Sequence, residues 1–430
     1  MRKCVFTIVA RNYIGLAQIL ERSLKDKNHD LDFFIFVADE FPRNSETKQI
    51  PLNVIFAREK LDISEDAWIQ MSFKYDLTEF CTSIKPSAFL YLLKNFEYEQ
   101  IIYLDPDIYV FGSFDPVFKM LETYSIVITP HILTFNTNYE GDLPESDFMA
   151  TGVYNLGFCG IRKSVSSFKM ISWWHNVLTS KCYIDSYSHS FTDQKWIDFL
   201  PAFFNSDDLL VARHLGMNIA PWNFFEREIV QSGEGLMVRH RGTEEQMQAE
   251  QVIFVHFSGY NYKELKEGNV VQNNVKNLKD YPDIKLVTDT YAAAINSQKN
   301  VFDRFIVENY QYNFFENGSP IIGFHRRLYR SLIEKGEVII DPFSVNDSSF
   351  YSRLKKVGMI KPMKINIDRA NKENLPNLKL KLSIFNRLLR LLYRALGLER
   401  YLTLIRLMRP YSRYESQIHL IDKQYDKGNI

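Results

Sequence analysis

The stretch IIYLDPDIYV, residues 101–110, decides the fold. Its apolar residues, rich in Ile, Tyr and Val, predict a buried β-strand. Pro106 lacks a backbone donor and favours extended backbone in the residue before it, so we expect the strand to end there. Because residues i and i+2 of extended backbone point to the same side, Asp105 and Asp107 should converge at the carboxyl end of the strand. Open α/β sheets bind ligands at that end, and a carboxylate pair suits a divalent cation that holds a diphosphate.

Strand-like and helix-like patterns alternate on both sides of this stretch, over the first 265 residues. The expected strands, besides 101–110, are residues 5–10, 33–38, 54–57, 125–129 and 252–257, and the expected helices are 13–24, 87–93 and 168–178. This alternation predicts a mostly parallel α/β sheet with helices on both faces. The polar residues 132–150 predict a loop or lid over the site. We expect a helical extension over 266–365, then a linker and basic amphipathic helices over 366–430.

The composition excludes several classes of protein. Of the 430 residues, 52 are Lys or Arg and 52 are Asp or Glu, so a net charge of zero argues against general nucleic-acid binding. None of the four cysteines lies in a C-x-x-C pair, which disfavours a disulfide framework or a zinc cluster and fits the cytoplasm. We predict neither a signal peptide nor a run of about 20 apolar residues that could span a bilayer.

Three further segments carry candidate functional residues, each with a structural alternative. Asn155 precedes Gly157, which would permit close backbone approach to a ligand, or would mark a bulge in a strand. Asp193 and Gln194 precede an amphipathic helix, where Asp193 would otherwise stabilise the helix N-terminus. His256 ends a strand, and its imidazole is either structural or completes an oxygen-rich metal shell.

Taken in order, these segments resemble the GT-A glycosyltransferases, and most closely the family 8-like enzymes of bacterial polysaccharide and lipopolysaccharide assembly. The resemblance covers roughly residues 3–265. It rests on Ala-Arg-Asn-Tyr at 10–13, Tyr-Leu-Asp-Pro-Asp at 103–107, Asn-Leu-Gly-Phe at 155–158, Asp-Gln at 193–194, Pro-Trp-Asn at 221–223 and His-Phe-Ser-Gly at 256–259. It implies a GT-A fold and metal-dependent transfer of a sugar, with retention, from a nucleotide-diphosphate donor to a glycan or lipid-linked acceptor.

The resemblance also implies roles for individual residues. The set implied to bind the nucleotide sugar is Ala10, Asn12, Tyr13, Asp105 and Gly259, with Asn12 and Tyr13 on the base and ribose. The implied ligands of Mn²⁺ or Mg²⁺ are Asp105, Asp107 and His256. The implied catalytic residues, which would face the donor sugar, are Asn155, Asp193 and Gln194.

Two positions depart from the family pattern. Ala10 stands where the family usually has an aspartate that recognises uracil, and a UDP-sugar is nevertheless the expected donor. The family's diphosphate-binding lysine, six residues after the late histidine, corresponds to Tyr262. Either the neighbouring Lys263 or Lys85 would then supply the positive charge.

Two rival functions use similar residues. A sugar-nucleotide nucleotidyltransferase also combines an α/β sheet with carboxylate-bound Mg²⁺, but it would normally have a glycine-rich phosphate loop after its first strand, which residues 11–13 lack. A non-catalytic scaffold with a decayed GT-A domain is the second rival. The intact Asp105, Asp107 and His256 argue against it.

The C-terminal segment has a charge pattern of its own. Residues 374–414 contain nine basic residues and one acidic residue, Glu399, for a net charge of +8. Arg387, Arg390 and Arg394 share one helical face, and Gly397 should separate helices over 380–396 and 399–409. The pattern is typical of interfacial helices on anionic lipid, which would place the protein on the inner face of the cell membrane. A hairpin packed on the protein's own core, or a dimer contact, is the alternative.

Overall fold

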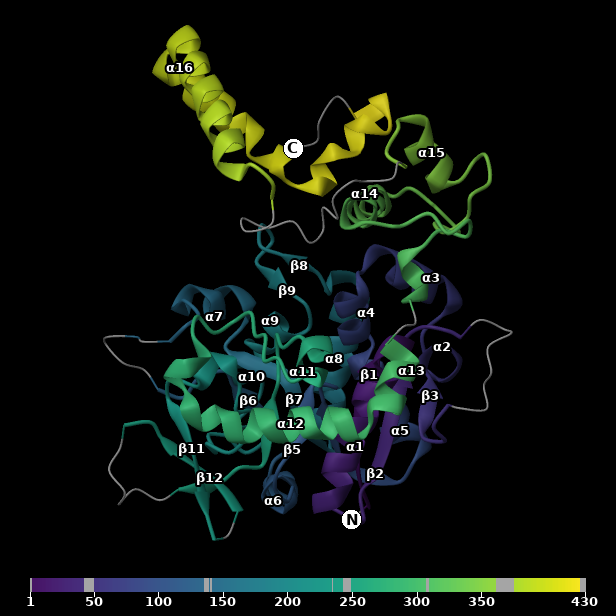
Figure 1. Ribbon diagram of the computed structural model, residues 1–430. Helices are drawn as coiled ribbons and strands as arrows, with labels where there is room; N and C mark the ends of the chain where they lie inside the picture. The colour runs from purple at the N-terminus through teal and green to yellow at the C-terminus, as the bar shows by residue number, and fades with distance from the viewer. Residues whose placement is uncertain are drawn as a thin grey trace. The chain divides into compact units, whose positions relative to one another are not determined.

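The computed structural model describes residues 2–41, 50–134, 139, 141–233, 235–242, 249–306, 309–360 and 375–425 (Figure 1). Contacts divide the chain into two compact units, which we describe separately. The first unit is Met1–Ser64 with Leu77–Gln311, and the second is Glu65–Asp76 with Tyr312–Ile430. The functional boundaries that we placed at residues 265 and 365 stay predictions. Most of the predicted linker, 366–374, lies outside the described residues.

A seven-stranded sheet with the order β10-β6-β7-β4-β1-β2-β3 forms the centre of the first unit (Figure 1). Its strands are β1 (Arg2–Val9), β2 (Asp32–Val37), β3 (Val54–Phe56), β4 (Tyr98–Leu104), β6 (Ile126–Pro130), β7 (Tyr154–Arg162) and β10 (Leu209–Val211). Only β7 runs antiparallel to its neighbours among these seven strands. The predicted mostly parallel sheet is confirmed.

Helices cover both faces of this sheet because successive residues of its strands, which point to opposite faces, are mostly apolar and buried. Val5 and Val9 of β1 belong to the same core cluster as residues of α1 (Ile14–Lys27) and α6 (Asp115–Thr123). Phe6 points to the other face, where its ring lies 4.8 Å from that of Phe89. The helices on that side are α4 (Leu77–Ser83), α5 (Lys85–Asn95) and α8 (Val165–Lys181). The predicted α/β class is therefore confirmed on both faces.

The strand that carries the aspartate pair ends where the sequence predicts. β4 stops at Leu104, and a turn follows in which the Ile108 amide donates to the Asp105 carbonyl over 3.1 Å. The chain continues as β5 (Ile108–Val110), which leaves the large sheet and pairs antiparallel with β14 (Phe254–His256). The register sets His256 opposite Ile108, so the two parts of the site meet through a short two-stranded ladder.

The remaining elements of the first unit surround this framework. They are α2 (Ala57–Lys60), α7 (Glu145–Thr151), β8 (Ile184–Asp185), β9 (Ser190–Phe191), α9 (Gln194–Ile197), α10 (Leu200–Phe203), an antiparallel sheet of β11 (Arg227–Ser232), β12 (Gly235–His240) and β13 (Glu250–Gln251), α11 (Tyr262–Lys266), α12 (Lys285–Ser297) and α13 (Lys299–Ile306). The prediction of a loop over 132–150 is wrong at its C-terminal end, where α7 begins at Glu145. Residues 135–138 and 140 lie outside the described residues.

The second unit is helical and recruits a segment from the N-terminal half of the chain. Its elements are α3 (Glu65–Lys74), α14 (Gly323–Glu334), α15 (Phe350–Lys356) and the 3₁₀-helix η9 (Tyr414–Leu420). The buried guanidinium of Arg326 donates to the carbonyls of Ser72, Phe73 and Tyr75 over 2.6–3.2 Å. One side chain thus satisfies acceptors left open at the end of α3. The sequence analysis did not predict that α3 belongs with these later helices.

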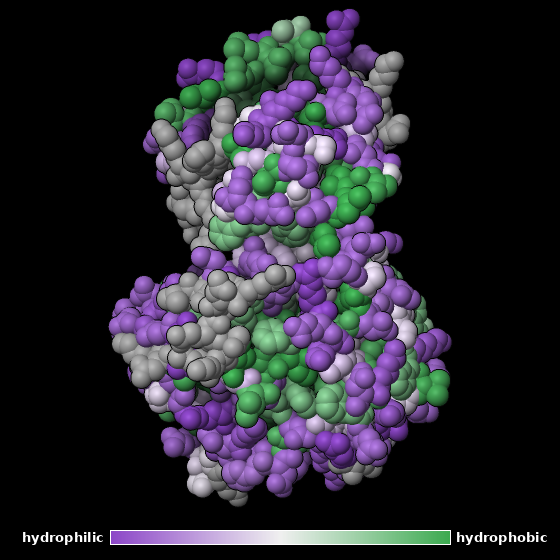
Figure 2. Space-filling view, turned by 90° about the vertical axis from the view of Figure 1, so that its right-hand side faces the viewer, coloured by the Kyte–Doolittle hydropathy of each residue, from purple (hydrophilic) through white to green (hydrophobic). Residues whose placement is uncertain are grey.

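The C-terminal helix α16 (Leu378–Met408) is interrupted at Gly397, whose backbone has φ 72° and ψ 172°. Two helices separated near Gly397, as predicted, are therefore confirmed. No residue within this described helix is buried. Figure 2 shows hydrophobic residues gathered at the top of the view, the height at which Figure 1 draws α16. Among the described residues, every helix is too short or too polar to cross a membrane.

Candidate functional site

The structure brings the three predicted metal ligands together. One ligand atom from each of Asp105, Asp107 and His256 lies within 4.8 Å of the other two. The His256 Nε2 is 3.0 Å from Asp107 Oδ1 and 3.7 Å from Asp105 Oδ2. Atoms that share one cation at roughly 2.0–2.6 Å can be at most about 5 Å apart, so this cluster fits one ion with little movement.

Backbone geometry explains why these side chains meet. The Asp105 amide donates to Gly157 O over 2.8 Å, and the Phe257 amide donates to Asp107 O over 2.9 Å. The convergence comes from the turn at Pro106 and from the β5–β14 pairing, rather than from one extended strand. The pairing of β7 with β6 shifts register between Ile128 and Thr129, opposite the segment that contains Gly157, as the bulge alternative expects. A Cβ at Gly157 would also lie 2.5 Å from His256 Cε1. The missing side chain makes room for the imidazole.

Hydrogen bonds define how His256 faces the carboxylates. The Gly157 amide can only donate, so the Asn155 atom 3.2 Å from it is the side-chain oxygen. That oxygen also lies 3.2 Å from His256 Nδ1, which must therefore carry the proton. His256 Nε2 is left to face Asp105 and Asp107, in the orientation that a metal-ligating histidine needs.

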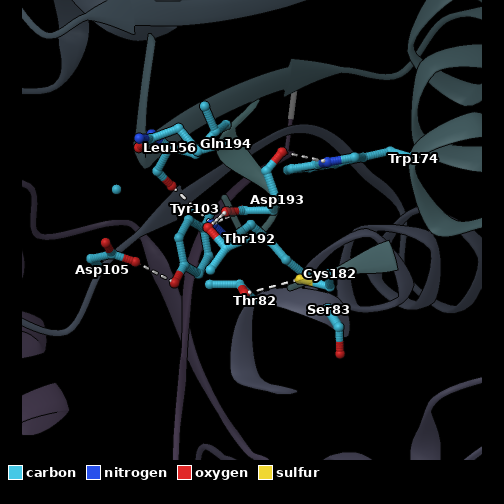
Figure 3. Close-up of polar contacts among 12 residues, drawn as sticks. Thr82, Ser83, Tyr103, Asp105, Leu156, Trp174, Cys182, Thr192, Asp193 and Gln194 are labelled. Carbon is cyan, nitrogen blue, oxygen red and sulfur yellow. Dashed lines mark hydrogen bonds and ion pairs between the residues drawn. The ribbon is translucent and has the colours of Figure 1, made fainter. Parts of the chain in front are cut away.

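A buried ion pair between Lys85 and Asp193 lies next to the site and is connected to Asp105. Lys85 Nζ lies 2.5 Å from Asp193 Oδ2 and donates to Leu156 O over 2.9 Å. The ammonium stands 4.1 Å from the centre of the Tyr103 ring, whose hydroxyl donates to Asp105 Oδ1 over 2.5 Å (Figure 3). Asp193 is thereby connected to the carboxylate pair through two intervening side chains.

Gln194 and Asn155 form a second connection. Gln194 Oε1 accepts from the Leu156 amide over 3.2 Å and from Asn155 Nδ2 over 3.4 Å, and Gln194 Nε2 donates to Thr151 O. Asn155 then reaches His256 as described. Asp193 is the residue before α9, but its side chain makes no capping hydrogen bond, so the alternative of a simple helix cap does not describe it.

A pocket of about 280 Å³ opens in front of the aspartates. It is lined by side chains of the β1 end, of α4 and of the Asp turn, including Ala10, Tyr13, Thr78, Cys81, Thr82, Asp105, Asp107 and Tyr262. Asn155, Asp193 and Gln194 do not contribute to the described lining and stand behind it, each at most 7% exposed. The Asn12 Oδ1 is buried without a hydrogen-bond partner among the described residues, and Asn12 is not part of the described lining of this pocket.

The two candidate cations for a diphosphate differ in their surroundings. Lys85 is 1% exposed and is held by Asp193. Lys263 is exposed on α11. Tyr262, at the family's lysine position, has its hydroxyl 3.0 Å from both Asp107 Oδ2 and Phe257 O. Gly259 has a φ of +77°, and a Cβ there would meet Asn274 at 2.8 Å.

The pKa values of the two aspartates are shifted in opposite directions. Burial raises the pKa of Asp105 and outweighs the opposing effects of Lys85 and His256. Burial also acts to raise the pKa of Asp107, but His256 and hydrogen bonds lower it by more, so its pKa is below the usual range. Burial acts to lower the pKa of His256, and Asp107 and Asp105 reverse that effect, so its pKa is raised. Asp107 and the imidazole thus stabilise each other's charged forms.

Several residues near the site have roles that we did not predict. Tyr103 stands two residues before Asp105, and the same-side rule for extended backbone could have identified it. The ring of Trp222, in the Pro-Trp-Asn segment, packs edge-on against His256 with centroids 5.2 Å apart. Asp39, buried just beyond the end of β2, accepts from the Arg11 amide over 2.7 Å and fixes the turn that carries Asn12. Its place after a strand next to β1 was the available signal.

No protein-family model matches this chain. The uncharacterized protein YfnF of Bacillus subtilis strain 168 is 23% identical over 273 residues, which cover 62% of this chain and 84% of that protein. Among solved structures, the galactosyltransferase LgtC is 14% identical with a TM-score of 0.35, covering 60% of this chain and 87% of its own. The glycosyltransferase GlyE of Streptococcus pneumoniae TIGR4 is 13% identical with a TM-score of 0.38, covering 74% and 67%. The bifunctional glycosyltransferase WbbM is 12% identical with a TM-score of 0.40, covering 70% and 51%. The functional argument therefore rests on the site.

Proposed function

We propose that this chain is a metal-dependent glycosyltransferase that moves a sugar from a nucleotide-diphosphate donor to a glycan or lipid-linked acceptor. The observation that carries the proposal is the cluster of Asp105, Asp107 and His256, whose ligand atoms lie within 4.8 Å of one another beside a pocket of about 280 Å³. The cluster follows the carboxyl end of β4, where open α/β sheets bind ligands.

The chemistry of the ligand set fits Mn²⁺ or Mg²⁺, because two carboxylates and one imidazole are oxygen-rich and borderline in softness. A divalent cation bound there would neutralise the charge that develops on a leaving nucleoside diphosphate. Asp105 and Asp107 would hold it through their carboxylates, and Asn155 would keep His256 Nε2 directed at it.

The donor would occupy the pocket between β1 and α4. Ala10 and Tyr13 line this pocket. Gly259 would complete the nucleotide site, and Asn12, whose buried side-chain oxygen has no partner among the described residues, would bind the base or ribose together with Tyr13. A UDP-sugar is the donor that we propose. The exposed Lys263 is the better candidate for the diphosphate, because Lys85 is already held by Asp193.

The proposal also gives the buried polar groups a role in the transfer. Asn155, Asp193 and Gln194 would act from behind the pocket: Asn155 and Gln194 through their contacts with His256, and Asp193 through Lys85 and Tyr103 to Asp105. An acceptor hydroxyl would attack the anomeric carbon as that carbon becomes oxocarbenium-like. Retention of configuration is part of the proposal by resemblance to family 8. An acceptor linked to lipid would place the protein on the cytoplasmic face of the cell membrane.

The test is thermal unfolding of the full chain with a panel of nucleotide sugars, each with and without Mn²⁺ or Mg²⁺. Ligand bound at about 100 times its Kd should stabilise the folded state by about 2.7 kcal/mol. We expect stabilisation by at least one nucleotide sugar, only when the cation is present, and metal-dependent release of its nucleoside diphosphate. Release of pyrophosphate from a nucleoside triphosphate and a sugar phosphate would identify a nucleotidyltransferase instead. Absence of both stabilisation and turnover across the panel would support the scaffold.

A further inference from the structure

The described helix α16 exposes an unusual amount of apolar surface. Large apolar side chains that are at least 40% exposed occur along its whole length: Leu380, Leu382, Ile384, Phe385, Leu388, Leu391, Leu392, Tyr393, Leu398, Leu402, Ile405, Leu407 and Met408. Contiguous apolar patches of this kind on soluble proteins mark interaction sites. The protein's own core does not cover this one, because no residue within the described helix is buried.

The sequence of α16 divides this surface into two unequal faces. At 3.6 residues per turn, the polar side chains before Gly397 fall mainly on one narrow face: Lys379, Ser383, Asn386, Arg387, Arg390 and Arg394. The broader remainder carries the leucines, Ile384 and Phe385, with Lys381 the basic exception. Basic side chains beside a wide apolar face complement anionic headgroups above acyl chains.

Both ends of α16 belong to the second unit, and the C-terminal end is firmly attached. After Pro410 the chain enters η9, where Ile418 is 4% exposed in the core cluster of α14 and α15. Glu415 accepts from Arg330 over 3.0 Å. The apolar helix is therefore a segment held by a packed anchor that follows it. A truncation before Leu375 would remove that anchor, so point variants are the sounder test.

We infer that α16 is a docking element for the surface of an anionic lipid bilayer, lying in the interface with its broad leucine-rich face toward the acyl chains. Arg387, Arg390 and Arg394 would contact the headgroups, and the break at Gly397 would let the two helices follow the surface independently. Binding itself does not require the transfer reaction. The consequence for a lipid-linked acceptor rests on the proposed function.

The experiment is co-sedimentation of the full chain with vesicles of phosphatidylcholine alone and of phosphatidylcholine mixed with anionic phosphatidylglycerol. The basic variant is R387Q/R390Q/R394Q. Its control, K119Q/K169Q/K279Q, removes the same three charges from exposed positions of the first unit. Each basic residue near an anionic surface changes binding by roughly fivefold, so the basic variant should bind anionic vesicles about 100-fold more weakly, and the control should bind like the unmodified chain. High salt should weaken binding, because it screens exposed charges.

A second variant, L382Q/F385Q/L392Q, keeps every charge and tests the apolar face. It should also lose vesicle binding, with helix content by circular dichroism unchanged. Equal binding by the basic variant and its control, or failure of the unmodified chain to bind anionic vesicles, would overturn the inference. A different result would assign the apolar face to a second copy of the chain. In that case the unmodified chain would self-associate in sedimentation velocity without binding vesicles, and L382Q/F385Q/L392Q would abolish the self-association. Transfer to a soluble acceptor should be unaffected by all these variants, so either proposal can fail alone.

Discussion

Lys85 of the first unit and the arginines of α16 in the second unit show two opposite uses of positive charge. In the first unit Lys85 is 1% exposed and held by Asp193, a carboxylate 108 residues away in the chain. In the second, Arg387, Arg390 and Arg394 are exposed on a helix without a buried residue. A buried cation needs compensating groups, because desolvation penalises it otherwise. Lys85 has the carboxylate of Asp193, and Arg326 has backbone carbonyls. An exposed cation has no such requirement and remains available for a partner. The buried Lys85 therefore helps to hold the site together, whereas the exposed arginines of α16 remain available to bind a partner.

The largest expected effect is at the carboxylate pair. Asp107→Ala removes a proposed metal ligand, so transfer should fall by at least about 10³-fold, the scale of several kcal/mol of electrostatic stabilisation. Initial rates and Mn²⁺ titration of the folded protein measure this. Asp207→Ala, at an exposed position of the first unit, is the control and should retain both properties. Normal metal binding by the Asp107 variant would remove this residue from the metal site.

The Lys85–Asp193 pair tests the burial argument directly. Lys85→Met leaves a buried carboxylate without its cation, which should cost about 3–5 kcal/mol of unfolding free energy. Lys285→Met breaks the i,i+4 pair with Asp289, whose side chains are 75% and 58% exposed, and should cost at most about 0.5 kcal/mol. Urea unfolding of both, with Asp193→Asn and the double variant K85M/D193N, completes a double-mutant cycle. Equal losses of unfolding free energy at the two pairs would contradict the expectation that burial makes an ion pair more important for stability.

The Lys85–Asp193 pair also indicates which features of the structure can be predicted from the sequence and which cannot. The positions of most strands and the end of β4 could be predicted because apolar periodicity and Pro106 act locally. The order of the strands in the sheet could not, because it depends on contacts between residues distant in sequence. The clustering of Asp105, Asp107 and His256 could be predicted only because each follows or ends a strand within a familiar order of motifs. The Lys85–Asp193 contact could not, since no local pattern specifies which buried cation meets which carboxylate. The same holds for α3, whose C-terminal carbonyls are satisfied by Arg326, about 250 residues later.

A smaller effect is expected at Tyr262. Its hydroxyl lies 3.0 Å from Asp107 Oδ2 and helps to orient that carboxylate. Loss of a hydrogen bond behind a metal ligand typically weakens metal binding by about 10-fold or more, so Tyr262→Phe should raise the Kd for Mn²⁺ by about that factor. Isothermal titration measures the change. Tyr260→Phe, two residues before Tyr262, is a matched control, because the buried Tyr260 hydroxyl has no partner among the described residues. Similar Kd values for both variants would assign Tyr262 to packing alone.

The smallest expected effect is at the exposed Leu391, and a core leucine of the same unit provides the contrast. Leu391 of α16 is 56% exposed, whereas Leu332 of α14 is fully buried in the cluster around Phe73 and Ile418. Leu332→Ala should cost about 2–5 kcal/mol, since it removes buried methyl groups and leaves a cavity. Leu391→Ala should change stability by no more than about 0.5 kcal/mol, as exposed substitutions do. Urea unfolding of both variants in the absence of lipid makes the comparison. A large cost at Leu391 would mean that α16 packs against protein in solution, and its apolar face would then be unavailable to a bilayer.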